Sequence, residues 1–168
     1  MELKEMFLAQ LERESAAARK TIERVPEENN NWKPHEKSMT LGYLAGLVAT
    51  MPGWAEFMIN SDQLDLNDPS SEQFRAKADW TREELLKKVD DGVVRSRLAL
   101  SNTSEEHLLK LWRFAMGGRV MFEVPRYQAI SESMFCHMAH HRGQLTVYLR
   151  LNGAKVPAIY GPSADEMH

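Results

Sequence analysis

The chain has 168 residues, of which 43% are hydrophobic and 27% are charged, and this is the composition of one ordinary globular domain. Its formal net charge is −3 and its charged residues are spread without a basic stripe, so we expect no nucleic-acid partner. No stretch approaches the roughly 18 consecutive apolar residues of a membrane span, no signal peptide is recognisable, and the single cysteine excludes a disulfide within the chain. We therefore expect a cytoplasmic protein with no membrane association.

The first half of the chain predicts two helices followed by a loop. Residues 2–25 carry apolar side chains at three- and four-residue steps, which is the period of a helix. A second helix is expected to begin after Ser38 or Thr40, since either hydroxyl can cap it. Pro52 lacks a backbone donor and should break this helix. The polar residues 60–79 predict a surface loop.

A third helix and a hairpin are predicted next. Thr81 and Glu84 have the spacing of a capping box, in which each side chain satisfies a backbone N–H of the other residue. The helix that follows should end near Asn102. Within residues 108–124, apolar and aromatic side chains flank the pair Gly117-Gly118, which predicts a β-hairpin.

The last long helix is predicted from Pro125 to Asn152, where Gly153 suits the left-handed cap position. One stripe of this helix has helical spacing and includes two histidines: Ile130, Met134, His137, His141, Leu145 and Tyr148. Because apolar residues also occupy its other faces, we expect burial all round. The predicted fold class is therefore all-α: a single domain over residues 1–168, an antiparallel four-helix bundle with a small β-hairpin inserted before the last long helix.

His137 and His141 lie four residues apart and so share one face of the predicted helix. Two imidazoles on one face bind a divalent metal when a third ligand meets them from a neighbouring helix. The commoner situation is two buried histidines satisfied by hydrogen bonds. Glu56 and His35 are conceivable third ligands. His140 is rotated by about 100° from His141 and is expected at the surface.

Several separate segments resemble the DinB-like family of bacterial four-helix-bundle proteins, the DinB and YfiT type. They are His137-x-x-x-His141-Arg142-Gly143-Gln144-Leu145, the ending Tyr148 to Glu166, Trp32-Lys33-Pro34-His35, and Pro52-Gly53-Trp54. The resemblance covers most of the chain and implies a bundle that often dimerises. It also implies nickel or zinc held by three histidines, two of them His137 and His141. Relatives include thiol-dependent S-transferases.

Alignment with the family places the third metal ligand at position 47, which is Leu47 in this chain. Leucine cannot bind a metal. We therefore expect a DinB-like bundle protein of unknown activity with an inherited but incomplete histidine site. The alternative is a divalent-metal-dependent hydrolase or a thiol-dependent S-transferase acting on a small molecule. We further expect a small-molecule ligand in the bundle pocket, a homodimer and a role in stress response.

Four other residues of the last helix carry specific expectations. Arg142 is expected to pair with a carboxylate, and Gln144 to hydrogen-bond a neighbouring loop. Gly143 is interpreted as allowing close approach of another helix. Cys136 is interpreted as a small core residue, because its position places it on a different face from His137.

Overall fold

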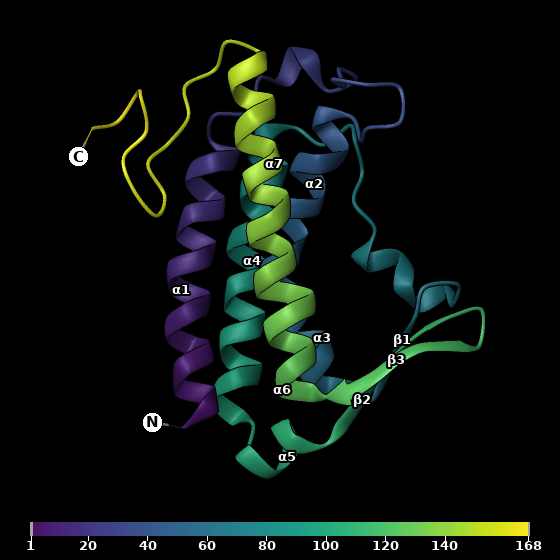
Figure 1. The fold of residues 1–168 in the computed structure, drawn as a ribbon. Coiled ribbons are helices and arrows are strands. Elements are labelled where there is room, and N and C mark those ends of the chain that lie inside the picture. The colour runs from purple at the N-terminus through teal and green to yellow at the C-terminus, as the bar shows by residue number, and fades with distance from the viewer. Residues whose placement is uncertain (1, 168) are drawn as a thin grey trace.

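The computed structural model describes residues 2–167 and is mostly helical (Figure 1). Its longer helices lie side by side and contact one another: α1 (Leu3–Ile22), α2 (Leu41–Thr50), α4 (Arg82–Asn102) and α7 (His137–Leu151). The short 3-10 turn η1 (Glu27–Asn29) lies between α1 and α2, and the short helix α5 (Glu105–Leu109) follows α4 and leads into the sheet. The predominance of helix is thus confirmed, while the regular antiparallel four-helix bundle stays a prediction. In the described part of the chain, no helix has both the length and the apolarity needed to cross a membrane.

The second helical region is interrupted where Pro52 predicted a break. Thr40 caps α2 by accepting the Tyr43 N–H at 3.3 Å. The 3-10 turn η2 (Met51–Gly53) then joins α2 to α3 (Trp54–Asn60). A Cβ on Gly92 of α4 would lie 2.8 Å from the Gly53 nitrogen, so glycine is needed for α4 to contact this turn. The break therefore redirects the chain and is packed tightly against α4.

The predicted capping box begins α4. Thr81 Oγ1 accepts the Glu84 N–H at 3.2 Å, and Glu84 Oε2 accepts the Thr81 N–H at 2.8 Å. Both bonds satisfy donors that an unprotected first turn leaves open. Apolar side chains of α4, such as Leu85 and Val89, enter the core shared with the other helices.

The predicted hairpin is present but belongs to a larger, mixed sheet. Strands β2 (Leu111–Met116) and β3 (Arg119–Pro125) pair antiparallel across Gly117-Gly118, both of which have positive φ. Strand β1 (Gln63–Asp65) pairs parallel with β2. The prediction of a loop over 60–79 was wrong at β1, while the rest of the region is irregular apart from the 3-10 segment η3 (Pro69–Phe74). A three-residue strand is too short for alternation to be visible in the sequence.

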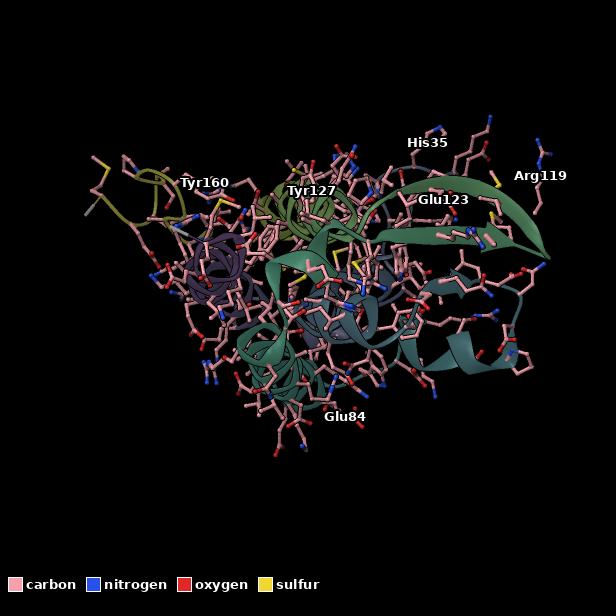
Figure 2. The ribbon with its side chains drawn as sticks, turned by 90° about the horizontal axis from the view of Figure 1, so that it is seen from below. His35, Glu84, Arg119, Glu123, Tyr127 and Tyr160 are labelled. Atoms are coloured by element: carbon pink, nitrogen blue, oxygen red, sulfur yellow. The ribbon has the colours of Figure 1, made fainter. Side chains whose placement is uncertain are left out.

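Asp65 connects the end of β1 to the hairpin turn. Its Oδ1 accepts the N–H groups of Asn67 at 2.9 Å and Gly117 at 2.8 Å, and its Oδ2 accepts that of Gly118 at 2.6 Å. Three backbone donors on one carboxylate lower the pKa of Asp65. The hairpin extends away from the helices, with Arg119 at its tip and Tyr160 on the opposite side of the molecule (Figure 2).

The last helical region has three parts with different geometry. It begins with α6 (Arg126–Ala129), passes through the π-helical segment η4 (Ile130–Cys136) and continues as α7. The predicted stripe is buried, except that His137 is half-buried. Burial all round was wrong, because one face is exposed, at Cys136, His140, Gly143, Gln144 and Val147. The side chains on that face are short or polar, so their exposure to solvent costs little free energy.

Arg126 fixes the junction between the sheet and the helices. Its side chain is fully buried and donates from Nε to the Met58 carbonyl at 2.6 Å. Its other nitrogens donate to the carbonyls of His107 and Ser61 and to Asp62 Oδ1. One guanidinium thereby satisfies carbonyl groups at the ends of α3 and α5.

Candidate functional site

The structure brings His137 and His141 into direct contact on α7. The two Nε2 atoms lie 2.8 Å apart and the ring centroids 4.5 Å apart. His141 is only 5% exposed. The two histidines that the sequence places on one helix face are therefore in contact, with their Nε2 atoms directed at each other.

Each ring also has a partner for its second nitrogen. His141 Nδ1 lies 2.7 Å from Gln144 Oε1, so Nδ1–H donates to this amide oxygen. The Ser133 backbone hydrogen-bonds to the His137 ring and raises the pKa of His137, as an accepting carbonyl does. The 2.8 Å between the two Nε2 atoms is a hydrogen-bonding distance, at which the rings can share one proton. Outer acceptors of this kind orient histidines that share a proton or bind a cation.

Burial disfavours the charged forms of the pair. It lowers the pKa of His137, and the neighbouring His141 lowers it further, against the Ser133 bond. Burial also lowers the pKa of His141, against the hydrogen bond to Gln144. Both rings are therefore predominantly neutral near pH 7.

The residues present do not complete the three-ligand site that the resemblance implies. Within residues 2–167, no three His, Cys, Asp or Glu side chains are grouped to hold a metal ion. Leu47 and His137 line the same cavity, so leucine occupies the side that a third ligand would have to reach. Glu56 lines a separate cleft beside α4, and His35 is exposed and accepts the Lys37 N–H at 3.2 Å. Neither of them approaches the pair.

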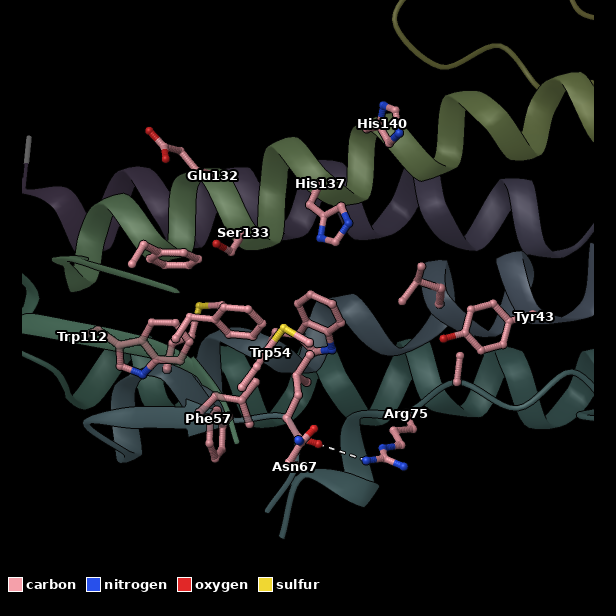
Figure 3. Close-up of a pocket in the computed structure, with 18 residues that line it drawn as sticks. Tyr43, Trp54, Phe57, Asn67, Arg75, Trp112, Glu132, Ser133, His137 and His140 are labelled. Carbon is pink, nitrogen blue, oxygen red and sulfur yellow. Dashed lines mark hydrogen bonds between the residues drawn. The ribbon is translucent and has the colours of Figure 1, made fainter. Parts of the chain in front are cut away.

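A cavity of about 920 Å³ opens beside His137 (Figure 3). Figure 3 shows the His137 ring directed from the helix toward the Trp54 indole, while His140 points the other way. The cavity lies between α2, α3, the sheet and the last helical region. Most of its lining is apolar: Leu47, Trp54, Phe57, Met58, Leu64, Leu66, Ala76, Trp112, Phe114, Met116 and Phe122. The polar lining comprises Tyr43, Asn67, Arg75, Glu132, Ser133, His137 and His140.

Two indole N–H groups of the cavity wall are unsatisfied. Trp54 Nε1 and Trp112 Nε1 are buried and have no hydrogen-bond partner among the residues described. The Trp54 ring centroid lies 5.8 Å from that of His137. Leaving a buried donor unpaired costs about 1–3 kcal/mol. Native proteins rarely carry this cost without a water or ligand to relieve it.

Arg142 behaves as predicted. It is 1% exposed and donates to Glu14 Oε2 at 2.7 Å and to the Glu14 carbonyl at 2.9 Å. Tyr160 of the C-terminal segment donates to the same Glu14 oxygen at 2.6 Å and contacts Arg142. The ion pair ties α7 to α1, so this motif residue has a structural role.

Three expectations for the same helix were wrong. Gln144 binds His141 and not a neighbouring loop, because a three-residue step returns its side chain to the histidine face. No atom lies within 4 Å of a Cβ added to Gly143, so nothing approaches closely there among residues 2–167. Cys136 is exposed and does not belong to the core.

These features define a mostly helical protein with a histidine pair beside an apolar cavity. The chain belongs to the DinB family, whose model matches residues 1–168. It is similar to a DinB-like protein from Bacillus cereus ATCC 10987, with 19% identity, a TM-score of 0.69, and coverage of 93% of this chain and 97% of that one. It is also similar to the DinB-like protein YjoA from Bacillus subtilis, with 18% identity, a TM-score of 0.65, and coverage of 90% of this chain and 95% of that one. These two likenesses establish the shared fold.

A local match connects the chain to a curated protein. Over 30 residues the chain is 57% identical to the uncharacterized protein YrdA of Bacillus subtilis strain 168. The matched segment spans 18% of this chain and 18% of that protein. The family is therefore shown, and the matched names assign no reaction.

Sequence reasoning located the histidines and expected a pocket in the bundle, but it missed the part of the cavity wall that the sheet forms. The cavity walls come from segments far apart in the chain, including β1, β2 and β3. The available signal was the excess of apolar residues in the hairpin, since an isolated hairpin must cover one face. Nothing local indicated that Leu64 and Leu66, within a predicted loop, would line the same space.

Proposed function

We propose that this DinB family member binds a small organic molecule in the cavity beside His137, with the histidine pair serving as a hydrogen-bonding group in the wall. The observation that carries the proposal is the cavity itself, about 920 Å³ and predominantly apolar. Ligand sites are typically apolar hollows of roughly 300–1,000 Å³ with a few convergent polar groups. His137, Ser133 and Tyr43 supply such groups here.

The histidine chemistry supports binding of a ligand through a lone pair or a ring N–H. Because burial lowers the pKa of His137, this ring is neutral near pH 7 and can accept or donate. Its neighbour His141 is held by Gln144, which fixes the orientation of the pair. A ligand that reaches His137 therefore meets an oriented polar group within an apolar wall.

A cavity-filling variant tests this proposal. Leu64→Trp adds a large side chain to the wall, and Val94→Trp makes the same change on the exposed side of α4, where the valine is 60% exposed. Titration with the uncharged apolar dye phenylnaphthylamine should give saturable fluorescence enhancement with wild type and Val94→Trp. Leu64→Trp should weaken binding about tenfold or more. Non-saturable binding by wild type, or equal binding by both variants, would contradict the proposal.

The metal-dependent hydrolase or thiol-dependent S-transferase is the second candidate, and one observation favours it. The two Nε2 atoms face each other, and imidazole nitrogens are common ligands of divalent cations. Bonds of about 2.0–2.1 Å in tetrahedral geometry require about 3.3 Å between the nitrogens, so the observed 2.8 Å would have to widen. The remaining ligands would have to come from outside the described chain.

Elemental analysis separates the two candidates. The protein should be purified without a metal-affinity tag, so that no nickel is introduced. Less than about 0.1 nickel or zinc per chain supports the incomplete site. Near-stoichiometric metal that is lost in His137→Ala would establish the metal-dependent candidate instead.

The homodimer implied by the resemblance is also part of the proposal. The exposed face of α7 includes Val147 and Leu151, which are 57% and 59% exposed. Apolar side chains along an exposed helix face support helix-to-helix contact between two copies. Sedimentation velocity of wild type and Val147→Glu tests this: the variant should be monomeric where wild type is dimeric.

A further inference from the structure

We infer that the ligand of this cavity is an uncharged, flat aromatic molecule that carries a carbonyl-type oxygen as hydrogen-bond acceptor. The inference rests on the proposed function, because it assigns a chemical class to the occupant of that site. Three independent properties of the wall lead to it: its rings, its unpaired donors and the pairing of its charges.

The rings of the wall favour a flat aromatic ligand. Phe114 and Phe122 stack with centroids 5.3 Å apart and an interplanar angle of 23°, and Trp112 lies 6.3 Å from Phe122. Trp54 and Phe57 line the same cavity from α3. Aromatic side chains prefer offset-stacked or edge-to-face partners over irregular aliphatic ones. A planar ring system offers both arrangements at once to walls on different sides.

The unpaired donors call for an acceptor oxygen. Trp54 and Trp112 both line the cavity, and their Nε1–H groups lack a partner in the described part of the chain. An indole nitrogen donates and cannot accept, so only an acceptor can satisfy it. Both nitrogens are covered by neighbouring atoms, so an acceptor reaches them only after a small movement of the wall. The side chains of Met58 and Met116 also line the cavity and are flexible enough to allow such a movement.

The charged groups of the lining favour an uncharged ligand. Apart from imidazoles, the ionisable side chains with a formal charge are Arg75 and Glu132. Arg75 donates to the Leu66 carbonyl at 2.9 Å and lies 3.3 Å from Glu72. Glu132 is exposed and accepts from Gln128 at 3.1 Å. A charged ligand would give up hydration without finding an unpaired counter-ion in this lining.

A matched pair of probes tests the inference. Fluorenone and fluorene have the same flat ring system, and only fluorenone carries a carbonyl oxygen; fluorene carboxylate adds a negative charge. Calorimetric titration of wild type should show fluorenone binding about tenfold tighter than fluorene, and fluorene carboxylate no tighter than fluorene. In Trp54→Phe or Trp112→Phe, which keep an aromatic ring but remove the donor, the preference for fluorenone should shrink toward unity.

Nuclear magnetic resonance gives a second readout that does not require the variants to fold well. The chain has four tryptophans, so four indole Nε1–H signals are expected. Fluorenone should shift the signal of Trp54 or Trp112, while Trp32 and Trp80, which do not line the cavity, serve as internal controls. Fluorene should leave the hydrogen-bond-sensitive proton shift of all four nearly unchanged.

The outcomes separate this inference from the proposed function. Equal affinity for fluorenone and fluorene would overturn the inference and leave the binding cavity standing. Tightest binding of the carboxylate would overturn the uncharged class. A preference for fluorenone that survives in both tryptophan variants would overturn the role of the indoles. If none of the three probes nor phenylnaphthylamine binds, the proposed function fails and the inference fails with it.

Discussion

Arg142 of α7 donates to Glu14 of α1 at 2.7 Å, and the two side chains are 1% and 5% exposed. An ion pair this deeply buried depends on complete hydrogen bonding, because each charge has lost most of its hydration. The Glu14 carbonyl and the Tyr160 hydroxyl provide the additional bonds. Arg142 stands next to His141 in the chain, but it is turned by about 100° around the helix, into the contact between α1 and α7.

Removal of this arginine should strongly destabilise the fold. Arg142→Met leaves Glu14 buried without its counter-ion, which typically costs about 3–5 kcal/mol. Urea unfolding followed by circular dichroism measures the change. Arg97→Met is the matched control, because Arg97 and Glu12 form an exposed pair, 49% and 53% exposed, whose loss costs about 0–1 kcal/mol. Similar effects of the two substitutions would contradict the structural role of Arg142.

The same cluster predicts a pH dependence of stability. Burial raises the pKa of Glu14, but hydrogen bonds from Tyr160 and Arg142 outweigh it, and the net pKa is lowered from 4.5. A lowered carboxyl pKa stabilises the folded state above the unfolded value, and this contribution is lost as the pH falls through the folded pKa. Unfolding free energies should therefore decrease from about pH 6 to about pH 3, and less steeply in Glu14→Gln. An unchanged slope in that variant would show that other groups dominate.

Leu47→His should complete a three-imidazole site. Position 47 and His137 face the same cavity, so a histidine there can approach the existing pair. After incubation with zinc and gel filtration, the variant should retain about one zinc per chain by elemental analysis, and wild type much less. Val94→His, on the exposed side of α4, measures how much zinc an additional histidine retains when it lies away from the pair. Equal retention by the control and Leu47→His would refute the geometric assignment.

Arg126→Lys should loosen the junction between helix and sheet. A lysine keeps the positive charge, but its single nitrogen cannot donate at the same time to the carbonyls of Met58 and Ser61 and to the Asp62 carboxylate, as the planar guanidinium does. We expect a loss of at least about 2 kcal/mol in urea unfolding. Binding of phenylnaphthylamine should weaken as well, since the sheet is a wall of the cavity. Arg113→Lys, at an exposed pair with Glu123, should change neither measurement.

Asp65→Asn should free the hairpin turn from β1. The amide offers one acceptor oxygen where the carboxylate offered two, so the Gly117 and Gly118 N–H groups cannot both remain satisfied. Their hydrogen exchange should accelerate several-fold, which nuclear magnetic resonance can follow. In wild type the protection of both amides, measured relative to their intrinsic exchange rate at each pH, should fall as the pH drops through the lowered pKa of Asp65. Asp90→Asn, on the surface of α4, should leave both amides unchanged.

Features set by neighbouring residues were predictable from the sequence. The capping box of Thr81 and Glu84, the break at Pro52 and the hairpin at Gly117-Gly118 each depend on residues at most a few positions apart. The histidine pair belongs to the same group, because i and i+4 on a helix are neighbours whatever surrounds them. Local chemistry is sufficient in these cases.

Features that depend on distant segments were missed. Strand β1 forms because it pairs with the edge of β2 and because Asp65 accepts hydrogen bonds from the hairpin turn. Neither contact can be read from the three residues of β1 alone. Cys136 resembles a core residue by type, and its exposure follows only from which helix faces receive partners. The partner of Arg142, Glu14, is likewise 128 positions away in the chain.

The π-helical segment Ile130–Cys136 lies between α6 and α7. It allows the side chains of α6 and those of α7 to face directions that one continuous α-helix could not combine. An α-helix turns by about 100° per residue and a π-helix by less, so the segment shifts the angular register of the side chains that follow it relative to those before it. Arg126 orients the end beside the sheet, and Arg142 orients the end that carries the histidines. The segment therefore sets the angle around the helix at which His137 and His141 stand relative to the sheet that forms a wall of the cavity.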